Sequence, residues 1–176
     1  MSDDLRNLYG VNLIVAILTR FPLLDEVHYR KEDDRIGIAM DFRLQLVPEE
    51  AFFAFKEELT EILLAFTQLE EEKKFHVDCE FKPLADDWWQ TFLFIPAKEI
   101  RIPLLNMLVQ WFQDFFHDGI LPKEKSVLLL NEDERNYQED LIENMLQVLR
   151  SEKPATSLRG IREEQQIIVF KTSPNK

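Results

Sequence analysis

Apolar and polar residues alternate without interruption between Arg35 and Leu46. A period of two residues places successive side chains on opposite faces of an extended chain, so this segment is predicted to be a half-buried β-strand. Residues 26–31 precede it, and the acidic run 32–34 lies between the two segments. The two segments are therefore expected to form an antiparallel hairpin with an acidic tip.

Four segments have the apolar spacing of amphipathic helices, namely residues 4–21, 48–70, 102–117 and 133–149. The first and the third carry apolar residues around more of their circumference than one layer of core requires. Such helices are expected to lie between two layers or against another molecule. A buried strand is the alternative for the short apolar run in the middle of the first segment.

The remaining apolar runs predict short strands. Residues 75–81 alternate like the first strand, and residues 88–95 follow them after a turn, which predicts a second hairpin. The 88–95 strand is apolar on both faces, so it is expected to be central and covered on both sides. Residues 126–130 predict a short buried strand, and residues 158–161 and 166–171 predict a final hairpin.

These elements predict an α+β protein with a mainly antiparallel sheet of hairpins interleaved with about four helices. A helix followed by a hairpin occurs three times in this order, so an internal helix-hairpin repeat is an alternative way to describe the chain. The order also allows a parallel crossover from strand 88–95 through the third helix to strand 126–130. No linker rich in proline, glycine or serine divides the chain. Residues 1–171 are therefore expected to form one domain, and residues 172–176 a flexible C-terminal tail.

The composition mainly limits which partners and which cellular location are expected for the protein. The chain has 176 residues, with 21 Lys and Arg against 33 Asp and Glu, which gives a formal net charge of −12. This charge repels phosphate backbones and anionic lipid head groups, so neither nucleic acid nor membrane is an expected partner. Cys79 is the only cysteine, which excludes an intrachain disulfide and suits a reducing compartment. Without an export signal or a long apolar stretch, a cytoplasmic location is expected.

The sequence contains no catalytic signature. Its four glycines lie far apart, whereas phosphate-binding loops need clustered glycines, so we predict no catalytic residues and no cofactor. His76, Asp78 and Glu80 would share one face of a strand and could converge on a metal ion, although a solvated polar face explains the same pattern. The polar run that begins at Asn131 is better explained as a helix cap than as a ligand site.

Two adjacent tryptophans follow two aspartates at residues 86–89. On an extended strand Trp88 and Trp89 must point to opposite faces, so only one of them enters a given core layer easily. The other is either covered by a helix or exposed as an anchor for a protein partner. Trp111 and Phe115, on the third helix, raise the same question. These four aromatic residues are the predicted partner-binding residues.

The sequence favours a non-catalytic protein-interaction module: an adaptor, a regulator or a chaperone-like dimer that presents apolar surface rimmed by acid to a protein partner or to a second copy. The surplus apolar helix surface, the tryptophan pair and the charge of −12 support this hypothesis. The alternative is an enzyme or small-ligand-binding protein with a pocket between sheet and helices, using scattered carboxylates with His76 or His28. A mimic of nucleic-acid charge is disfavoured, because Lys and Arg are interspersed throughout the chain.

Overall fold

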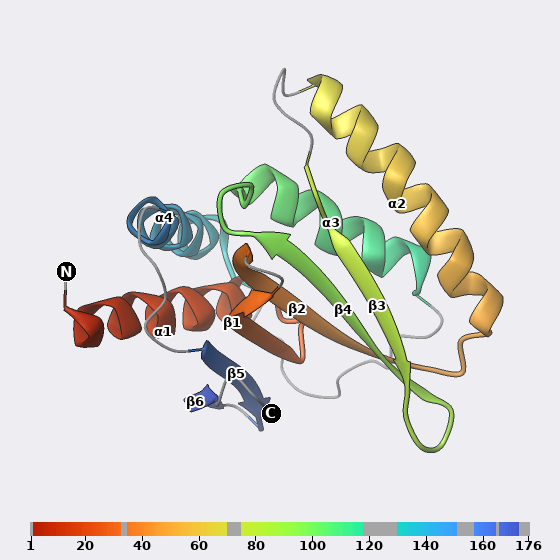
Figure 1. Cartoon of the computed structure of the whole chain (residues 1–176), viewed down its shortest axis with the longest axis horizontal. Helices are drawn as coiled ribbons and strands as arrows, with labels where there is room; N and C mark the ends of the chain where they lie inside the picture. The colour runs from red at the N-terminus through yellow and green to blue at the C-terminus, as the bar shows by residue number, and fades with distance from the viewer. Residues whose placement is uncertain are drawn as a thin grey trace.

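The computed structural model describes residues 2–32, 35–69, 75–117, 130–150, 157–164 and 166–172. Its helices and strands follow one another in this order: α1 (Asp3–Arg20), β1 (Glu26–Glu32), β2 (Arg35–Gln45), α2 (Glu49–Leu69), β3 (Asp78–Pro83), β4 (Trp88–Pro96), α3 (Ile102–Phe115), α4 (Glu132–Leu149), β5 (Ser157–Glu163) and β6 (Gln166–Thr172) (Figure 1). The predicted strand 126–130, apart from residue 130, lies outside the described residues. Of the predicted tail 172–176, Thr172 instead ends β6, and residues 173–176 lie outside the described residues.

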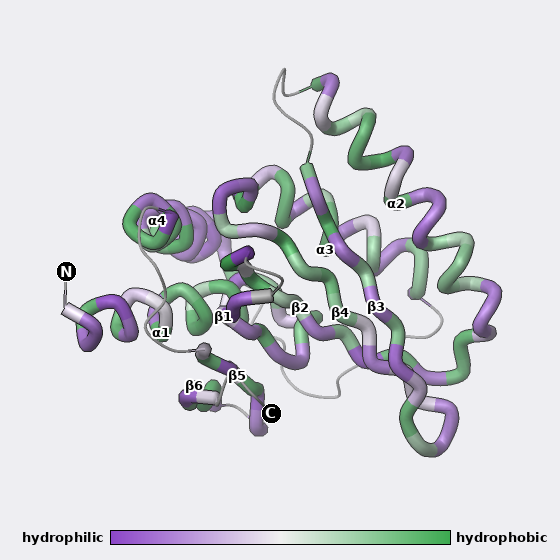
Figure 2. Tube along the Cα trace, in the orientation of Figure 1, coloured by the Kyte–Doolittle hydropathy of each residue, from purple (hydrophilic) through white to green (hydrophobic). Residues whose placement is uncertain are grey.

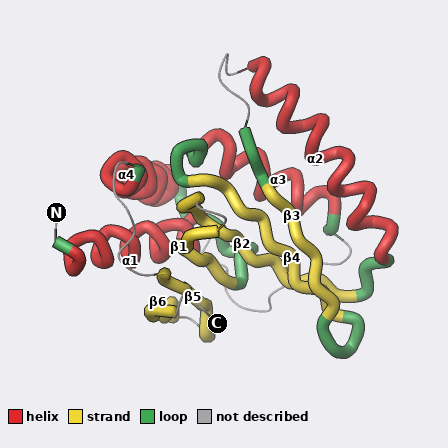
Figure 3. Tube along the Cα trace, viewed as in Figure 1, coloured by secondary structure: helices red, strands yellow, loops and turns green. Residues whose placement is uncertain are grey.

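The strands form one six-stranded sheet with the order β3-β4-β2-β1-β5-β6, which confirms the predicted α+β class. Every neighbouring pair is antiparallel, so the sheet consists of three hairpins side by side (Figure 3). A helix comes directly before each hairpin in the chain: α1 before β1 and β2, α2 before β3 and β4, and α4 before β5 and β6. No helix in the described part of the chain is long and apolar enough to cross a membrane.

Three helices pack on one face of this sheet. The even-numbered residues of β2 point toward them, and the ring of Phe42 stacks on Phe112 of α3 with 3.9 Å between centroids. α1 lies against β1 and β5, where Gly160 permits close approach, because a Cβ at this position would overlap Ile14 Cγ2. Figure 2 shows the hydrophobic stretches of α1 and β4 that supply much of this core.

α2 reaches the sheet through aromatic rings. Phe52 lies 4.6 Å from Trp89 and 4.2 Å from Phe81 between ring centroids, while Phe55 stacks on Trp111 of α3 at 4.4 Å. Aromatic pairs at these separations add stabilisation beyond the area that they bury. α2 and α3 are thus joined to each other and to β3 and β4 by one aromatic cluster.

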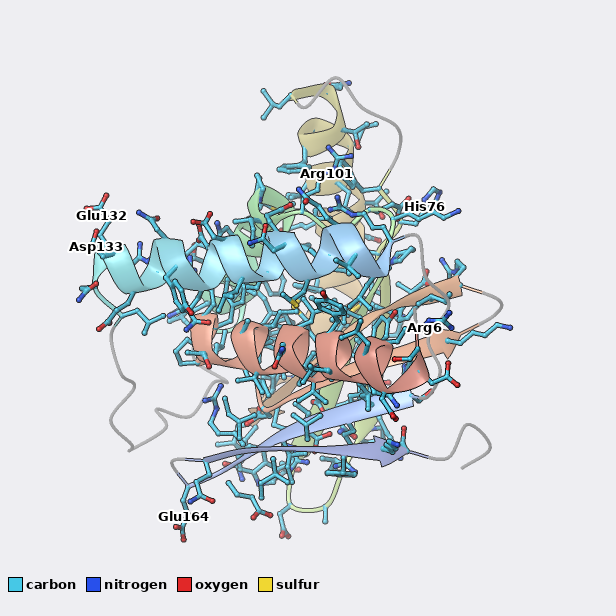
Figure 4. All side chains as sticks on the ribbon, turned by 90° about the vertical axis from the view of Figure 1, so that its left-hand side faces the viewer. Arg6, His76, Arg101, Glu132, Asp133 and Glu164 are labelled. Carbon is cyan, nitrogen blue, oxygen red and sulfur yellow. The ribbon has the colours of Figure 1, made fainter. Side chains whose placement is uncertain are left out.

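α4 lies beside α1 on the side away from the sheet, with Ile142, Leu146 and Leu149 buried (Figure 4). It begins with a capping box in which the Asn131 side chain accepts from the Glu134 backbone and the Glu134 side chain accepts from the Asn131 backbone. This confirms that the polar run at Asn131 is a cap. Buried apolar residues on α1 therefore face a layer on both sides, as their distribution predicted.

The second face of the sheet, opposite α1, α2 and α3, corrects one prediction. β2 was expected to be half-buried, but it is buried on both faces from Gly37 to Phe42. β4 is an interior strand as expected, and within the described residues its second face is shielded by arginines: Arg30 lies over the ring of Phe92 at 5.8 Å, and Arg35 over Phe94 at 5.4 Å. Long side chains from neighbouring strands cover what a period of two would leave exposed.

Candidate functional site

A cluster of charged side chains lies at the centre of the second face. The register of β1 and β2 places Glu26 opposite Asp41, and His28 follows Glu26 on the same face of β1. Arg159 of β5 lies opposite His28. Arg43 of β2 and Gln90 of β4 form the adjacent pair and complete the cluster. Residues far apart in the sequence are therefore brought together by strand pairing alone.

Glu26 is the centre of this cluster. It is 5% exposed, and its carboxylate accepts hydrogen bonds from Arg159 Nε at 3.0 Å and from Arg159 Nη2 at 2.6 Å. Arg43 Nη2 at 3.2 Å and His28 Nε2 at 3.2 Å approach the same two oxygens. Burial alone would raise the pKa of Glu26, but the hydrogen bonds from His28 and Arg159 outweigh burial and lower it to about 2. Glu26 is therefore ionised throughout the neutral range.

Asp41 has the opposite character. Its side chain is fully buried, Gln90 Nε2 donates to Oδ2 at 2.5 Å, and Oδ1 has no hydrogen-bond partner among the described residues. Burial raises the pKa of Asp41 to about 7, and the negative charges of Glu26 and Asp25 act in the same direction against the hydrogen bond from Gln90. The two facing carboxyl groups thus titrate over different pH ranges, because the hydrogen bonds from His28 and Arg159 outweigh burial at Glu26, whereas burial dominates at Asp41.

The ligand atoms of Glu26, His28 and Asp41 lie within 4.8 Å of one another, a spacing that a metal ion could use. Both oxygens of Glu26, however, already accept from guanidinium groups, so a cation would have to displace Arg159 and lie close to its charge. An acid-base role for Asp41 needs contact with a substrate, and its side chain is completely covered. The cluster therefore has the properties of a buried ion-pair network.

The predicted metal ligands do not converge. His76 lies before the start of β3, at the side of the molecule in Figure 4, and its Nδ1 is 2.5 Å from Glu99 Oε1. Asp78 forms an ion pair with Arg35, while Glu80 is exposed. Among the residues that the structure describes, the spacing for shared coordination occurs at Glu26 instead. A metal site on β3 remains a prediction from the sequence.

The predicted aromatic residues divide between the two faces of the sheet. Trp89 packs on Phe52, and Trp111 and Phe115 both pack on Phe55 of α2. The surplus apolar surface of helices 3–20 and 102–115 is therefore largely covered within the chain, by α4 and α2. Trp89, Trp111 and Phe115 are partly exposed, as Trp88 is, so their role as partner-binding residues stays a prediction. Trp88 alone points to the second face, where it is partly exposed.

Trp88 lies at one end of β4, where the end of β2 and the turn between β3 and β4 carry two exposed leucines. We call Leu46, Leu84, Asp86, Asp87 and Trp88 the Trp88 patch. Leu46 is 74% exposed and Leu84 is 37% exposed. The turn between β3 and β4, drawn as a loop in Figure 3, holds the patch together through hydrogen bonds from Leu84 N to Trp88 O at 2.8 Å and from Leu46 N to Asp87 O at 3.1 Å.

The backbone of this patch is strained. Leu46, Asp86 and Asp87 have φ values of 59°, 59° and 60°, in the left-handed region that residues other than glycine rarely adopt. Aspartate tolerates this conformation, whereas leucine gains nothing there that would offset its strain. The carboxylates of Asp86 and Asp87 are exposed and give the patch an acidic rim.

Sequence reasoning missed Leu46, because it was counted as the last apolar residue of the strand. It also missed the buried cluster at Glu26. Comparison with protein-family models, with curated proteins and with solved structures finds no match to this chain.

Proposed function

We propose that the protein is a non-catalytic protein-interaction module that uses the Trp88 patch to bind a partner protein with an apolar side chain set among basic residues. Aromatic residues with two χ angles bury large areas at low entropic cost and are the most frequent anchors of protein interfaces. Trp88 and its two leucine neighbours supply such an anchor, and Asp86 and Asp87 supply charge complementarity at the rim.

The observation that carries this proposal is Leu46. A leucine that is 74% exposed contributes little to the core, and its φ of 59° costs free energy that a glycine would avoid. Strained residues cluster at ligand-binding and switch sites, so a strained leucine that is also exposed is a candidate for contact with another molecule. Trp88 is also partly exposed and lies at the same end of the β2-β4 pair, so both features occur at one end of the sheet.

Replacement of Leu46 with glycine tests the proposal, because its effects on folding and on binding have opposite signs. Relief of the left-handed strain is expected to leave the free energy of unfolding unchanged or to raise it by up to about 1 kcal/mol. Loss of the side chain is expected to lower partner recovery at least about tenfold. The measurement is capture of the tagged protein from its native extract, with partners quantified by mass spectrometry and stability by chemical denaturation.

Leu64→Ala is the matched control, since Leu64 is 56% exposed on α2, away from the patch. It should leave partner recovery unchanged, whereas Trp88→Ala should reduce recovery as Leu46→Gly does. Equal recovery with all four proteins would contradict the proposal. Retention of a small metabolite without any protein would instead support the enzyme or ligand-binding alternative.

A further inference from the structure

The two edges of the sheet differ in how they meet solvent. β3 and β6 each have a strand neighbour on only one side within the described sheet. β3 carries Asp78, Glu80, Lys82 and Pro83, and charges and proline are the devices by which edge strands avoid pairing with another chain. β3 is therefore a protected edge.

β6 has almost none of this protection. Its sequence, Gln-Ile-Ile-Val-Phe-Lys-Thr over residues 166–172, contains no proline and no acidic residue, although the whole chain carries a net charge of −12. Ile168 and Phe170 point to the second face and are 39% and 38% exposed. An exposed strand edge rich in β-branched and aromatic residues is a template for pairing with a further strand.

The residue pattern of β6 is complementary to itself. Opposite residues of an antiparallel pair point to the same face, so two copies of β6 can pair about a two-fold axis at Val169. This register pairs the whole strand, from Gln166 to Thr172. It places Ile168 against Phe170 of the partner subunit, at two symmetric positions. Aromatic residues opposite β-branched ones are stabilising cross-strand pairs.

We infer that a second copy of this chain occupies the β6 edge, in an antiparallel pairing of β6 with β6 centred on Val169. The pairing joins the two sheets into one continuous sheet, with the helices of both copies on the same side. It brings together the acid-free segments of two acidic chains, which limits repulsion between them. The contact lies at a strand edge remote in sequence from the Trp88 patch. A test of this dimer is therefore independent of a test of the proposed function.

Sedimentation velocity over a series of concentrations tests the pairing, together with a charge swap. The wild-type protein is expected to be a dimer. Ile168→Glu and Phe170→Lys, made separately, each place two charges against apolar partners and are expected to weaken the dimer about a hundredfold or more. The double variant sets each new glutamate opposite a new lysine and should return the dissociation constant to within about tenfold of wild type.

Phe53→Lys, at an exposed phenylalanine of α2, is the matched control and should leave the dimer intact. Phe170→Thr retains β propensity if a charged variant fails to fold, and it should weaken the dimer about tenfold. A wild-type protein that stays monomeric overturns the inference, as do single variants that keep the dimer. Failure of the folded double variant to recover the dimer would exclude this register.

Discussion

Replacement of Asp41 with asparagine is expected to stabilise the protein by about 2 to 4 kcal/mol at pH 8 and to change its stability little near pH 4. The pKa of Asp41 is about 7 in the folded protein and 3.8 ordinarily, so the folded state holds this proton more tightly than the unfolded chain. The contribution of Asp41 to the stability of the wild-type protein is therefore largest below pH 3.8, and it is lost as the pH rises through 7. Asparagine has nearly the same shape as aspartate and no charge, so the variant does not lose this stability as the pH rises.

Chemical denaturation of both proteins between pH 4 and pH 8 measures the effect. Asp140→Asn, at an exposed carboxylate on α4, is the control and should shift stability by less than about 0.5 kcal/mol at either pH. A gain that does not depend on pH would contradict the assigned cause. A loss of stability at pH 8 would mean that ionised Asp41 is stabilised, for example by a bound cation near Oδ1.

The opposite result is expected for the carboxylate that faces Asp41. Glu26→Gln should destabilise the protein by about 2 to 3 kcal/mol at pH 7, because two arginines and His28 lose their anionic partner. The pKa of Glu26 is about 2 when folded and 4.5 ordinarily, so its stabilisation is complete above pH 4.5. This contribution is lost as the pH falls toward 2, and the two proteins should converge there.

Glu80→Gln makes the same chemical change at an exposed position of the same face and should have little effect on the melting temperature. Thermal unfolding at pH 7 and at pH 3 distinguishes the two variants. Equal melting temperatures for Glu26→Gln and Glu80→Gln at pH 7 would show that the ion-pair network contributes nothing to stability. Loss of Glu26 also removes one charge that raises the pKa of Asp41, so the two sites should not be additive.

The helices and hairpins could be predicted because their signals are local. Apolar spacing located α1 to α4 within a few residues, and alternation located β2. Burial of β2 on both faces could not be predicted, because it depends on Phe94 lying against Gly37 and on Arg35 lying over the Phe94 ring. A period of two predicts which face of the sheet each side chain points to. It does not predict which residues of neighbouring strands cover that face.

The charged cluster could not be predicted from the hairpin alone. The predicted hairpin left residues 32–34 in its tip, a register that pairs Lys31 with Arg35 and Glu26 with Met40, whereas the observed register pairs Glu32 with Arg35 and Glu26 with Asp41. Arg159, moreover, reaches Glu26 only because β5 pairs with β1, a pairing across most of the chain that no local pattern encodes. Aromatic contacts of Trp111 and Phe115 with α2 are of the same kind, since surplus apolar surface on a helix does not reveal which element covers it.

Site-specific photo-crosslinking tests the central claim, that the Trp88 patch binds a protein. A photo-reactive amino acid would replace Leu84, which is partly exposed in the patch, and in a second protein Leu64, which is exposed on α2. After irradiation in native extract, a discrete protein adduct is expected at residue 84 and not at residue 64. Its yield should fall as salt is added, because the rim of Asp86 and Asp87 faces basic groups on the partner. No protein adduct at residue 84, or the same adducts at both positions, would show that the Trp88 patch is not a specific protein-binding surface.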